Sequence, residues 1–298
     1  MGVIATMTVI EARELGVARL GRNPALQSRS HADATLLLLH ALQWTRAELL
    51  ARPAYPLQPE EERLYREHLE KRARGIPIQY ITGEQEFWGL PFSVTPDVLI
   101  PRPETEHLVE AVLERLRDHP APRIVDVGTG SGAIAIALAH ALPQAQITAL
   151  DVSEAALTVA KKNAARNGVA AQIRWLHGDL LAGVLHENFD AVVSNPPYIA
   201  EAERATLSAE VRDHEPSLAL FAGATGLEIY ERLIPQARSV LAPEGWLFLE
   251  IGFGQQAAIE KFLFDWQQVV FVPDLQGIAR VACAQNSAGI THRKQEQR

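Results

Sequence analysis

The chain has 298 residues, enough for two domains, and its 47% hydrophobic content is sufficient for well-packed cores. Its one cysteine, Cys283, excludes a disulfide framework and a thiolate zinc site, and the histidines show no metal-ligand spacing, so no metal is expected. The net charge of −8 is uneven, because residues 1–75 carry 11 Lys or Arg and 9 Asp or Glu, whereas the remainder carries 17 and 27. An acidic remainder argues against stable binding to a nucleic-acid backbone.

No apolar run reaches the length that crosses a membrane, so no membrane association is expected. The amino terminus also lacks the basic-then-apolar pattern of a signal peptide, which predicts a cytoplasmic protein.

Residues 1–75 have the pattern of a small helical domain with four to five short helices. The sequence predicts a strongly charged helix over residues 59–74 that ends at Gly75. Three segments begin with a capping-box-like pattern, in which a Ser or Thr is followed three residues later by an acid. They are Thr8-Val9-Ile10-Glu11, Ser30-His31-Ala32-Asp33 and Thr45-Arg46-Ala47-Glu48.

Residues 76–100 change to alternating and aromatic residues, with glycines at Gly83 and Gly89 that fit turns. This pattern predicts a β-hairpin linker between the helical domain and a second domain over residues 101–298. Phe87 and Trp88 fit either a wall of a binding site or the core of the hairpin, since aromatic residues favour strands in any case.

The second domain begins with a helix over residues 101–117, and strands then alternate with helices from Arg123 onward. This alternation predicts an α/β domain with a parallel sheet covered on both faces. Strands are expected near residues 123–127, 146–150, 172–177, 189–194, 245–251, 268–272 and 278–284.

The first of these strands leads into a glycine-rich turn, which predicts a nucleotide-type ligand because glycine lets the backbone approach a ligand closely. The turn consists of Gly128, Thr129, Gly130, Ser131 and Gly132. Asp151 ends the second strand, where a carboxylate can accept both ribose hydroxyls. The same pattern fits a nicotinamide dinucleotide.

Two features favour S-adenosylmethionine over a dinucleotide. Asp126 stands just before the turn, which suits a ligand with an amino-acid end and no pyrophosphate. Asp179 and Leu180 follow the third strand, where an acid suits an adenine amino group and a leucine offers an apolar face. Asp179 also fits a solvated loop carboxylate.

The fourth strand ends in Asn195-Pro196-Pro197-Tyr198, a turn suited to methylating a planar nitrogen. The lone pair of such a nitrogen is delocalised, so it is a poor nucleophile. The Asn195 side-chain oxygen and the Pro196 carbonyl can accept its two N–H bonds and stabilise the charge that develops on methyl transfer. The prolines stiffen the turn, and Tyr198 can pack on the flat target group.

The chain resembles the release-factor glutamine methyltransferases of the HemK/PrmC type from about Gln79 to Ala284. The matching segments are residues 80–84, 86–90, 94–106, 128–132, 194–198, 214–216 and 250–252. The string Pro101-Arg102-Pro103-Glu104-Thr105-Glu106 is the most specific, since DNA adenine methyltransferases share the Asn-Pro-Pro-Tyr turn but lack this string. Relatives often carry Trp where this chain has Leu180.

This resemblance implies a class-I, Rossmann-like methyltransferase fold with a seven-stranded mixed sheet whose last strand is antiparallel. It also implies methylation by S-adenosylmethionine of the glutamine nitrogen N5 in the Gly-Gly-Gln loop of class-I peptide-chain release factors. Residues 1–75 have a helical pattern and a charge balance different from the rest, so we expect this domain to dock the body of the release factor. The alternatives are a ribosomal-protein glutamine methyltransferase, a DNA or RNA adenine-N6 methyltransferase, and a non-catalytic adaptor that binds the cofactor.

Four further residues allow two readings each. Glu104 and Thr105 could cap the following helix or touch the cofactor, and the helix-start reading is the stronger one for Glu104. His214 and Glu215 could accept a proton, but no third group orients them in the sequence, so structural roles in a loop are favoured.

Overall fold

The computed structural model describes residues 7–287, and the chain divides into two compact units. One unit contains the residues up to Glu84 together with Ser208–His214, and the other contains Gln85–Leu207 and the residues from Glu215 onward. A short stretch from the second half of the chain therefore belongs to the unit that is otherwise built from amino-terminal residues. The signal-peptide expectation falls largely on residues 1–6, which lie outside the described range.

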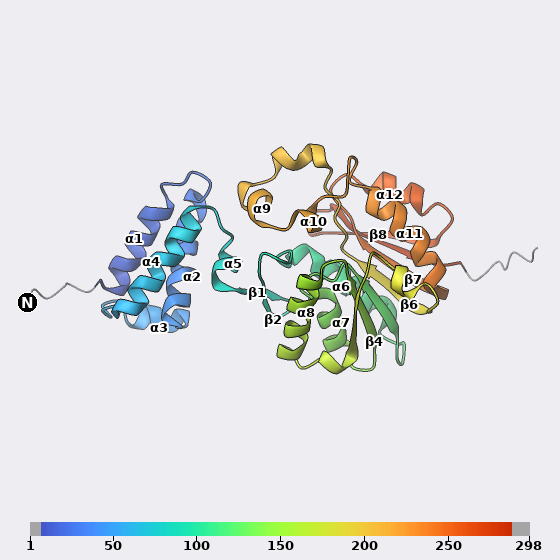
Figure 1. Ribbon diagram of the computed structural model, residues 1–298, viewed down its shortest axis with the longest axis horizontal. Helices are drawn as coiled ribbons and strands as arrows, with labels where there is room; N and C mark the ends of the chain where they lie inside the picture. The colour runs from blue at the N-terminus through green and yellow to red at the C-terminus, as the bar shows by residue number, and fades with distance from the viewer. Residues whose placement is uncertain (1–6, 288–298) are drawn as a thin grey trace, which may run out of the picture. The chain divides into compact units, whose positions relative to one another are not determined.

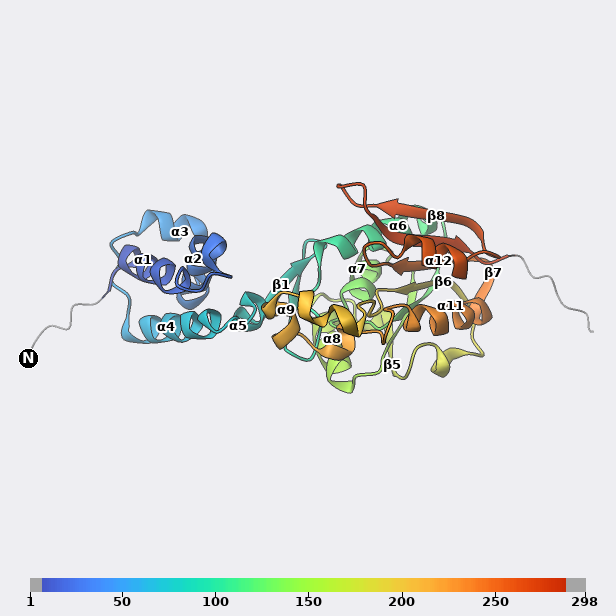
Figure 2. The same cartoon turned by 90° about the horizontal axis from the view of Figure 1, so that it is seen from above.

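The amino-terminal unit is helical, and its three long helices lie side by side in both views (Figure 1 and Figure 2). Buried aliphatic residues from these helices form its core together with the aromatic ring of Tyr65. Gly16 allows the close approach, because a Cβ at this position would overlap the Tyr65 hydroxyl. The helices of this part of the chain are α1 (Val9–Leu20), η1 (Gln27–Arg29), α2 (Ser30–Leu42), α3 (Arg46–Ala51), α4 (Pro59–Ala73) and α5 (Ile78–Thr82).

Two of the three predicted capping boxes are confirmed. Thr8 and Thr45 cap α1 and α3, and the acid three residues later accepts the threonine N–H at 2.7 Å and 2.8 Å, respectively. The third prediction is wrong, because Ser30 lies inside α2 and its hydroxyl donates to the carbonyl of Gln27 instead. The predicted end of α4 at Gly75 is confirmed by the positive φ of that residue, +88°.

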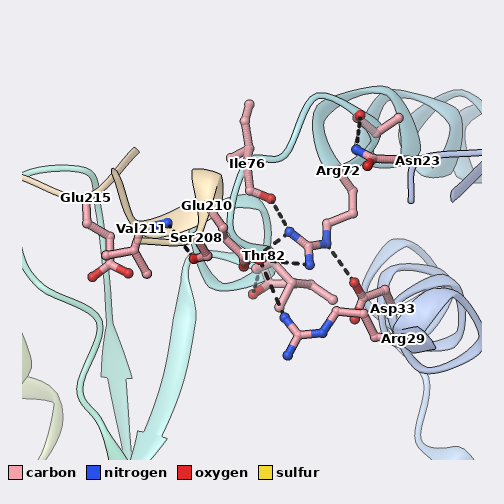
Figure 3. A network of polar contacts seen from close by, with 12 residues as sticks. Asn23, Arg29, Asp33, Arg72, Ile76, Thr82, Ser208, Glu210, Val211 and Glu215 are labelled. Atoms are coloured by element: carbon pink, nitrogen blue, oxygen red, sulfur yellow. Dashed lines mark hydrogen bonds and ion pairs between the residues drawn. The ribbon is translucent and has the colours of Figure 1, made fainter. Parts of the chain in front are cut away.

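A buried arginine holds the short helix α9 (Ala209–His214) within this unit (Figure 3). The side chain of Arg72 is fully buried, and its Nε donates to Asp33 Oδ2 at 2.7 Å. Its Nη1 donates to the carbonyl of Ile76 at 2.9 Å and lies 3.2 Å from Glu210 Oε1 of α9. Arg29 also pairs with Glu210 at 3.4 Å. A segment some 140 positions away in the sequence is thus attached to α4 by charge.

The predicted hairpin is confirmed as β1 (Glu84–Phe87) and β2 (Leu90–Ser93), but its expected length was wrong. The residues before it form α5, which ends at Gly83 with φ +76°. The two turn residues, Trp88 and Gly89, have φ +56° and +68°, as in the turns that match the twist of a two-residue hairpin. Phe87 is 1% exposed and packs edge-on against Phe92, so it belongs to the core.

The second unit contains the predicted seven-stranded mixed sheet, in the order β5-β4-β3-β6-β7-β9-β8. The parallel pairs β3–β4, β4–β5, β3–β6 and β6–β7 form its larger part, and β9 is antiparallel to both of its neighbours. β7 begins four residues earlier than expected, because Leu241 pairs with Phe189 before a shift in register. The strands are β3 (Arg123–Val127), β4 (Gln146–Asp151), β5 (Ile173–His177), β6 (Phe189–Ser194), β7 (Leu241–Glu250), β8 (Gln267–Pro273) and β9 (Ala279–Gln285).

Helices cover both faces of the sheet, as the alternation of strands and helices predicted. One face packs against α6 (Glu106–Leu116), α7 (Ala133–Ala141) and α8 (Glu154–Arg166), and the other packs against α11 (Glu228–Val240) and α12 (Gln256–Phe262). The remaining elements are η2 (Pro103–Thr105), η3 (Ala170–Gln172), η4 (Ala182–Val184), η5 (Glu201–Thr206) and α10 (Ser217–Leu220). Within residues 7–287, no helix is both long and apolar enough to span a bilayer.

Candidate functional site

A cavity of about 380 Å³ lies at the carboxyl ends of the parallel strands. β3 and β6 are neighbours at its centre, and the strand order runs away from them in both directions. Ligands of open α/β sheets bind in the crevice at this switch point. The walls come from the ends of β3, β4 and β6, from the loop after β5, and from two more distant segments, residues 97–99 and 216–232.

Two glycines of the predicted turn line the cavity, Gly128 with φ +73° and Gly130 with φ +55°. A Cβ at either position would meet no atom within 4 Å, so the backbone is open toward the space in front of it. The N–H groups of Gly128 and Thr129 donate to the carbonyl of Leu150, and the N–H of Gly130 donates to Asp151 Oδ2 at 2.8 Å. The turn is therefore fixed to the end of β4.

The other members of the turn stand behind the cavity walls. Thr129 is buried and its hydroxyl donates to Asp126 Oδ2 at 2.6 Å, while the carbonyl of Ser131 accepts from Asn163. Gly132 packs α7 against α8, because a Cβ there would lie 3.1 Å from that of Ala160. Asp126 itself is fully buried, and this burial raises its pKa to about 7. Any contact of these residues with a ligand remains a prediction.

Asp151, the last residue of β4, also lies in the cavity wall. Its Oδ2 accepts from Gly130, its Oδ1 accepts the N–H of Ser153 at 2.9 Å, and burial raises its pKa. The backbone N–H of Val152 also interacts with this carboxylate, and the lone pairs that remain can accept from a ligand hydroxyl. The backbone bonds hold it in one orientation for that purpose.

Asp179 and Leu180 also line the cavity, from the loop after β5. The carboxylate of Asp179 is more than half exposed and forms an ion pair with Arg232 of α11. Leu180 adopts a positive φ of +50° and packs against the core beneath it. Asp179 therefore has a partner already, which the sequence did not indicate.

The Asn195 turn forms the other end of the cavity, where Asn195, Pro196 and Pro197 line the wall. Ser194 anchors the turn, because its buried hydroxyl donates to the carbonyl of Val127 in β3 at 2.7 Å. The Nδ2 of Asn195 donates to Thr105 Oγ1 at 3.0 Å.

Tyr198 stands apart from this wall. Its hydroxyl donates to Glu250 Oε1 at 3.4 Å, and its carbonyl accepts from Gln255 at 2.9 Å. Burial raises the pKa of Tyr198 well above the usual range, so the phenol is a neutral donor. The packing of this ring on a target group therefore stays a prediction.

Glu215 holds the Pro-Arg-Pro string in place, which supports the structural role that we expected for Glu215. The side chain of Glu215 is 1% exposed, accepts an ion-paired hydrogen bond from Arg102 and accepts the N–H of Ile100 at 3.4 Å. Thr105 caps no helix with its side chain. Its hydroxyl instead contacts Asn195 and donates to Glu250 at 2.6 Å. Glu104 is exposed within η2.

Sequence reasoning missed part of the cavity wall. The missed residues are Asp97, Val98, Leu99, Pro216, Leu218, Ala219, Phe221, Ile229 and Arg232. They carry no ligand pattern of their own. Residues 97–99 and Pro216 lie within the matching strings at 94–106 and 214–216, so only the resemblance could have indicated them, and the other missed residues follow the second string.

The arrangement thus combines a glycine turn and a carboxylate at one end of a largely apolar cavity with an amide and two prolines at the other. The first end suits the ribose and chain of a nucleoside-type ligand. The second end presents acceptors to a second, planar group.

Comparison with known proteins agrees with this geometry. Residues 105–212 match the model of the methyltransferase small domain, and residues 11–83 match that of the PrmC N-terminal domain. The release factor glutamine methyltransferase of Koribacter versatilis is 45% identical over 84% of this chain and 89% of its own. The enzymes with the same name from Moorella thermoacetica and Bacillus subtilis are 47% and 40% identical over 85% and 86% of this chain, covering 89% and 91% of their own lengths.

Solved structures show the same fold at low identity. The catalytic domain of human Mettl16, solved with an RNA hairpin, has a TM-score of 0.55 and 21% identity over 74% of this chain and 82% of its own. A Thermus thermophilus 16S rRNA N2 G1207 methyltransferase, solved with AdoMet and guanosine, has a TM-score of 0.50 and 20% identity over 68% of this chain and 49% of its own.

Proposed function

The chain belongs to the release factor glutamine methyltransferases, and we propose that it methylates the side-chain nitrogen N5 of the glutamine in the Gly-Gly-Gln motif of class-I peptide-chain release factors. S-adenosylmethionine is the methyl donor in this proposal. The observation that carries this proposal is that Asn195, Pro196 and Pro197 line the same cavity as the glycine turn and Asp151. Peptide-chain release takes place in the cytoplasm, so the proposal also implies that location.

The cavity fits the donor. Gly128 and Gly130 leave their backbone open toward it, and the remaining lone pairs of Asp151 can accept from the ribose. Leu180 offers an apolar contact for an adenine ring, and Asp179 with its partner Arg232 borders the same region. When bound, S-adenosylmethionine supplies a methyl group already activated by the sulfonium.

The residues of the chain then have to orient a weak nucleophile. In our proposal the side-chain oxygen of Asn195 accepts one N–H of the target amide and the carbonyl of Pro196 accepts the other. These two acceptors fix the plane of the amide and favour the positive charge that develops on its nitrogen. No strong base is required if the proton leaves after the transfer.

The first 75 residues are proposed to dock the body of the release factor, while residues 101–298 receive its glutamine loop. The residues of this segment have a different charge balance from the rest of the chain. Deleting them should raise the KM for the protein substrate, because remote binding energy is lost. The deletion also removes Arg72 and Asp33, which hold α9, so Glu210→Gln in the full chain is the matched control. A KM equal to that of the control would contradict the docking role.

The test of the proposed function is a transfer assay with labelled S-adenosylmethionine. Purified release factor, ribosomal proteins and DNA are offered separately to the full chain. Label on the release factor alone supports the proposal. Label on a ribosomal protein or on DNA, with none on the release factor, would replace the proposed substrate.

A further inference from the structure

Glu250 is a buried carboxylate that the proposed reaction has not used. It ends β7, the strand next to β6 and its Asn195 turn, and only 3% of its surface is exposed. Its Oε2 accepts from the Thr105 hydroxyl at 2.6 Å, and its Oε1 accepts from the Tyr198 hydroxyl at 3.4 Å. Two side chains of the Asn195 turn are therefore connected to this carboxylate by hydrogen bonds. Tyr198 bonds it directly, and Asn195 bonds it through Thr105.

The single proton of the Thr105 hydroxyl gives this chain of hydrogen bonds a direction. An ionised Glu250 can only accept, so Thr105 must donate to it. The Thr105 oxygen is then left as an acceptor for Asn195, which turns the Nδ2 of the amide toward it at 3.0 Å. The oxygen of the amide is thereby the end that remains for the target nitrogen, which carries N–H donors.

We propose that Glu250 is a positioning residue that acts through Thr105 to decide which end of the Asn195 amide faces the target nitrogen. This inference rests on the proposed function. Glu250 touches neither the target nor the methyl donor in it. Its part is to keep an acceptor, rather than a donor, in front of the glutamine amide.

The arrangement also makes the orientation depend on pH. A protonated Glu250 can donate to Thr105, whose own proton can then go to the oxygen of Asn195. The amide would turn its NH₂ group toward the target, and two donors would face each other. Burial raises the pKa of Glu250 to about 7, so this change falls near neutral pH.

The groups around Glu250 come from four elements. Thr105 and Glu104 lie on η2, and the charge of Glu104 raises the pKa of Glu250, whereas Arg280 on β9 lowers it. Tyr198 comes from the turn, and its hydroxyl bond also lowers this pKa. Tyr230 of α11 donates to the main-chain carbonyl of Glu250 at 2.8 Å.

The test compares Thr105→Val, which removes the hydroxyl, with Thr105→Ser, which keeps it. Thr105→Val should lower kcat about tenfold, the effect of one lost hydrogen bond, with KM and cofactor affinity within about twofold of wild type. Thr105→Ser should restore most of kcat. Thr148→Val is the control, because Thr148 is also a buried threonine, and its hydroxyl bonds Arg174 instead of Asn195. It should leave kcat unchanged.

Glu250→Gln shows whether the carboxylate acts through the threonine. The double variant Glu250→Gln with Thr105→Val should have a kcat no lower than that of the slower single variant, because both substitutions disrupt the same hydrogen-bonded connection to Asn195. Wild type and the Thr148 control should lose kcat as the pH falls through about 7, and Thr105→Val should not. The proposal would be overturned if Thr105→Val had the kcat of wild type, or if Thr105→Ser were as slow as Thr105→Val. It would also be overturned if the kcat losses of the two single variants added up in the double variant, or if kcat of Thr105→Val fell at low pH as in wild type.

A measurement without substrate separates this inference from the proposed function. The side-chain amide NMR signals of Asn195 should shift with pH around 7 in wild type and stay constant in Thr105→Val. Constant signals in wild type would overturn the inference even if release factor is methylated. Absence of methylation on release factor by wild type would instead refute the proposed function.

Discussion

Replacing Arg72 by methionine should destabilise the amino-terminal unit more than any surface charge change. The side chain of Arg72 is fully buried and that of Asp33 is 8% exposed, so the variant leaves a buried carboxylate without its cation. Breaking a buried pair from one side costs about 3–5 kcal/mol. Glu210 is 23% exposed and keeps contact with water, so its share of the loss is smaller.

Such a loss corresponds to a large change in melting temperature. For a domain of 60–100 residues, 1 kcal/mol shifts Tm by roughly 4–8 °C, so Arg72→Met should lower the transition of this unit by more than about 10 °C. Differential scanning calorimetry together with hydrogen exchange in α1, α2 and α4 identifies the unit that melts. Arg63→Met is the matched control, because Arg63 is 62% exposed and its pair with Glu60 lies at the surface. It should cost at most about 1 kcal/mol.

The double variant Arg72→Met with Asp33→Asn distinguishes lost attraction from an unpaired charge. Removing both charges should recover part of the stability, because the remaining groups no longer include a buried ion. A stability of Arg72→Met within 1 kcal/mol of the Arg63→Met control would refute the reasoning. So would a double variant that is less stable than Arg72→Met alone.

Three further predictions concern the cavity and the buried carboxyl behind it. Asp151→Ala should weaken S-adenosylmethionine binding by roughly 1–3 kcal/mol in calorimetry. Asp179→Ala should weaken it by less, since Asp179 is exposed and paired with Arg232. Equal losses in the two variants, or tight binding of NAD, would contradict the assignment of the donor. Asn195→Ala should lower kcat about a hundredfold or more while donor affinity stays near that of wild type, and normal turnover would show that the target nitrogen is held elsewhere. Because burial raises the pKa of Asp126 to about 7, the folded protein holds a proton that the unfolded chain releases near pH 4, so the stability from this group is lost as the pH rises through 7. Thermal melts should therefore show Asp126→Asn gaining on wild type from pH 5 to pH 8, and an equal difference at both pH values would contradict this.

The parts of the site that the sequence predicts are those that follow directly from strand ends. Gly128, Gly130, Asp151 and the Asn195 turn each come just after an apolar strand, and parallel strands bring their carboxyl ends to one edge. Local patterns were therefore sufficient to place them in one cavity. The same logic does not separate Thr129 and Ser131, which are buried behind the cavity wall, from the neighbouring glycines that line it.

The parts that could not be predicted depend on contacts between distant residues. Thr105 and Glu250 are 145 positions apart, and neither carries a pattern that indicates the other. Asp33 was expected to be the acid of a capping box at Ser30, but its carboxylate pairs with Arg72 of another helix. The inclusion of α9 in the amino-terminal unit follows from the same arginine, which reads in the sequence as one more charge on a charged helix.

Peptide mass spectrometry of release factor after incubation with the full chain and S-adenosylmethionine tests the central claim most directly. The proposal predicts one added methyl group on the glutamine of the Gly-Gly-Gln motif, and a far lower yield in the same time from Asn195→Ala. A methyl group on another residue, or an equal yield from the Asn195→Ala variant, would contradict the account.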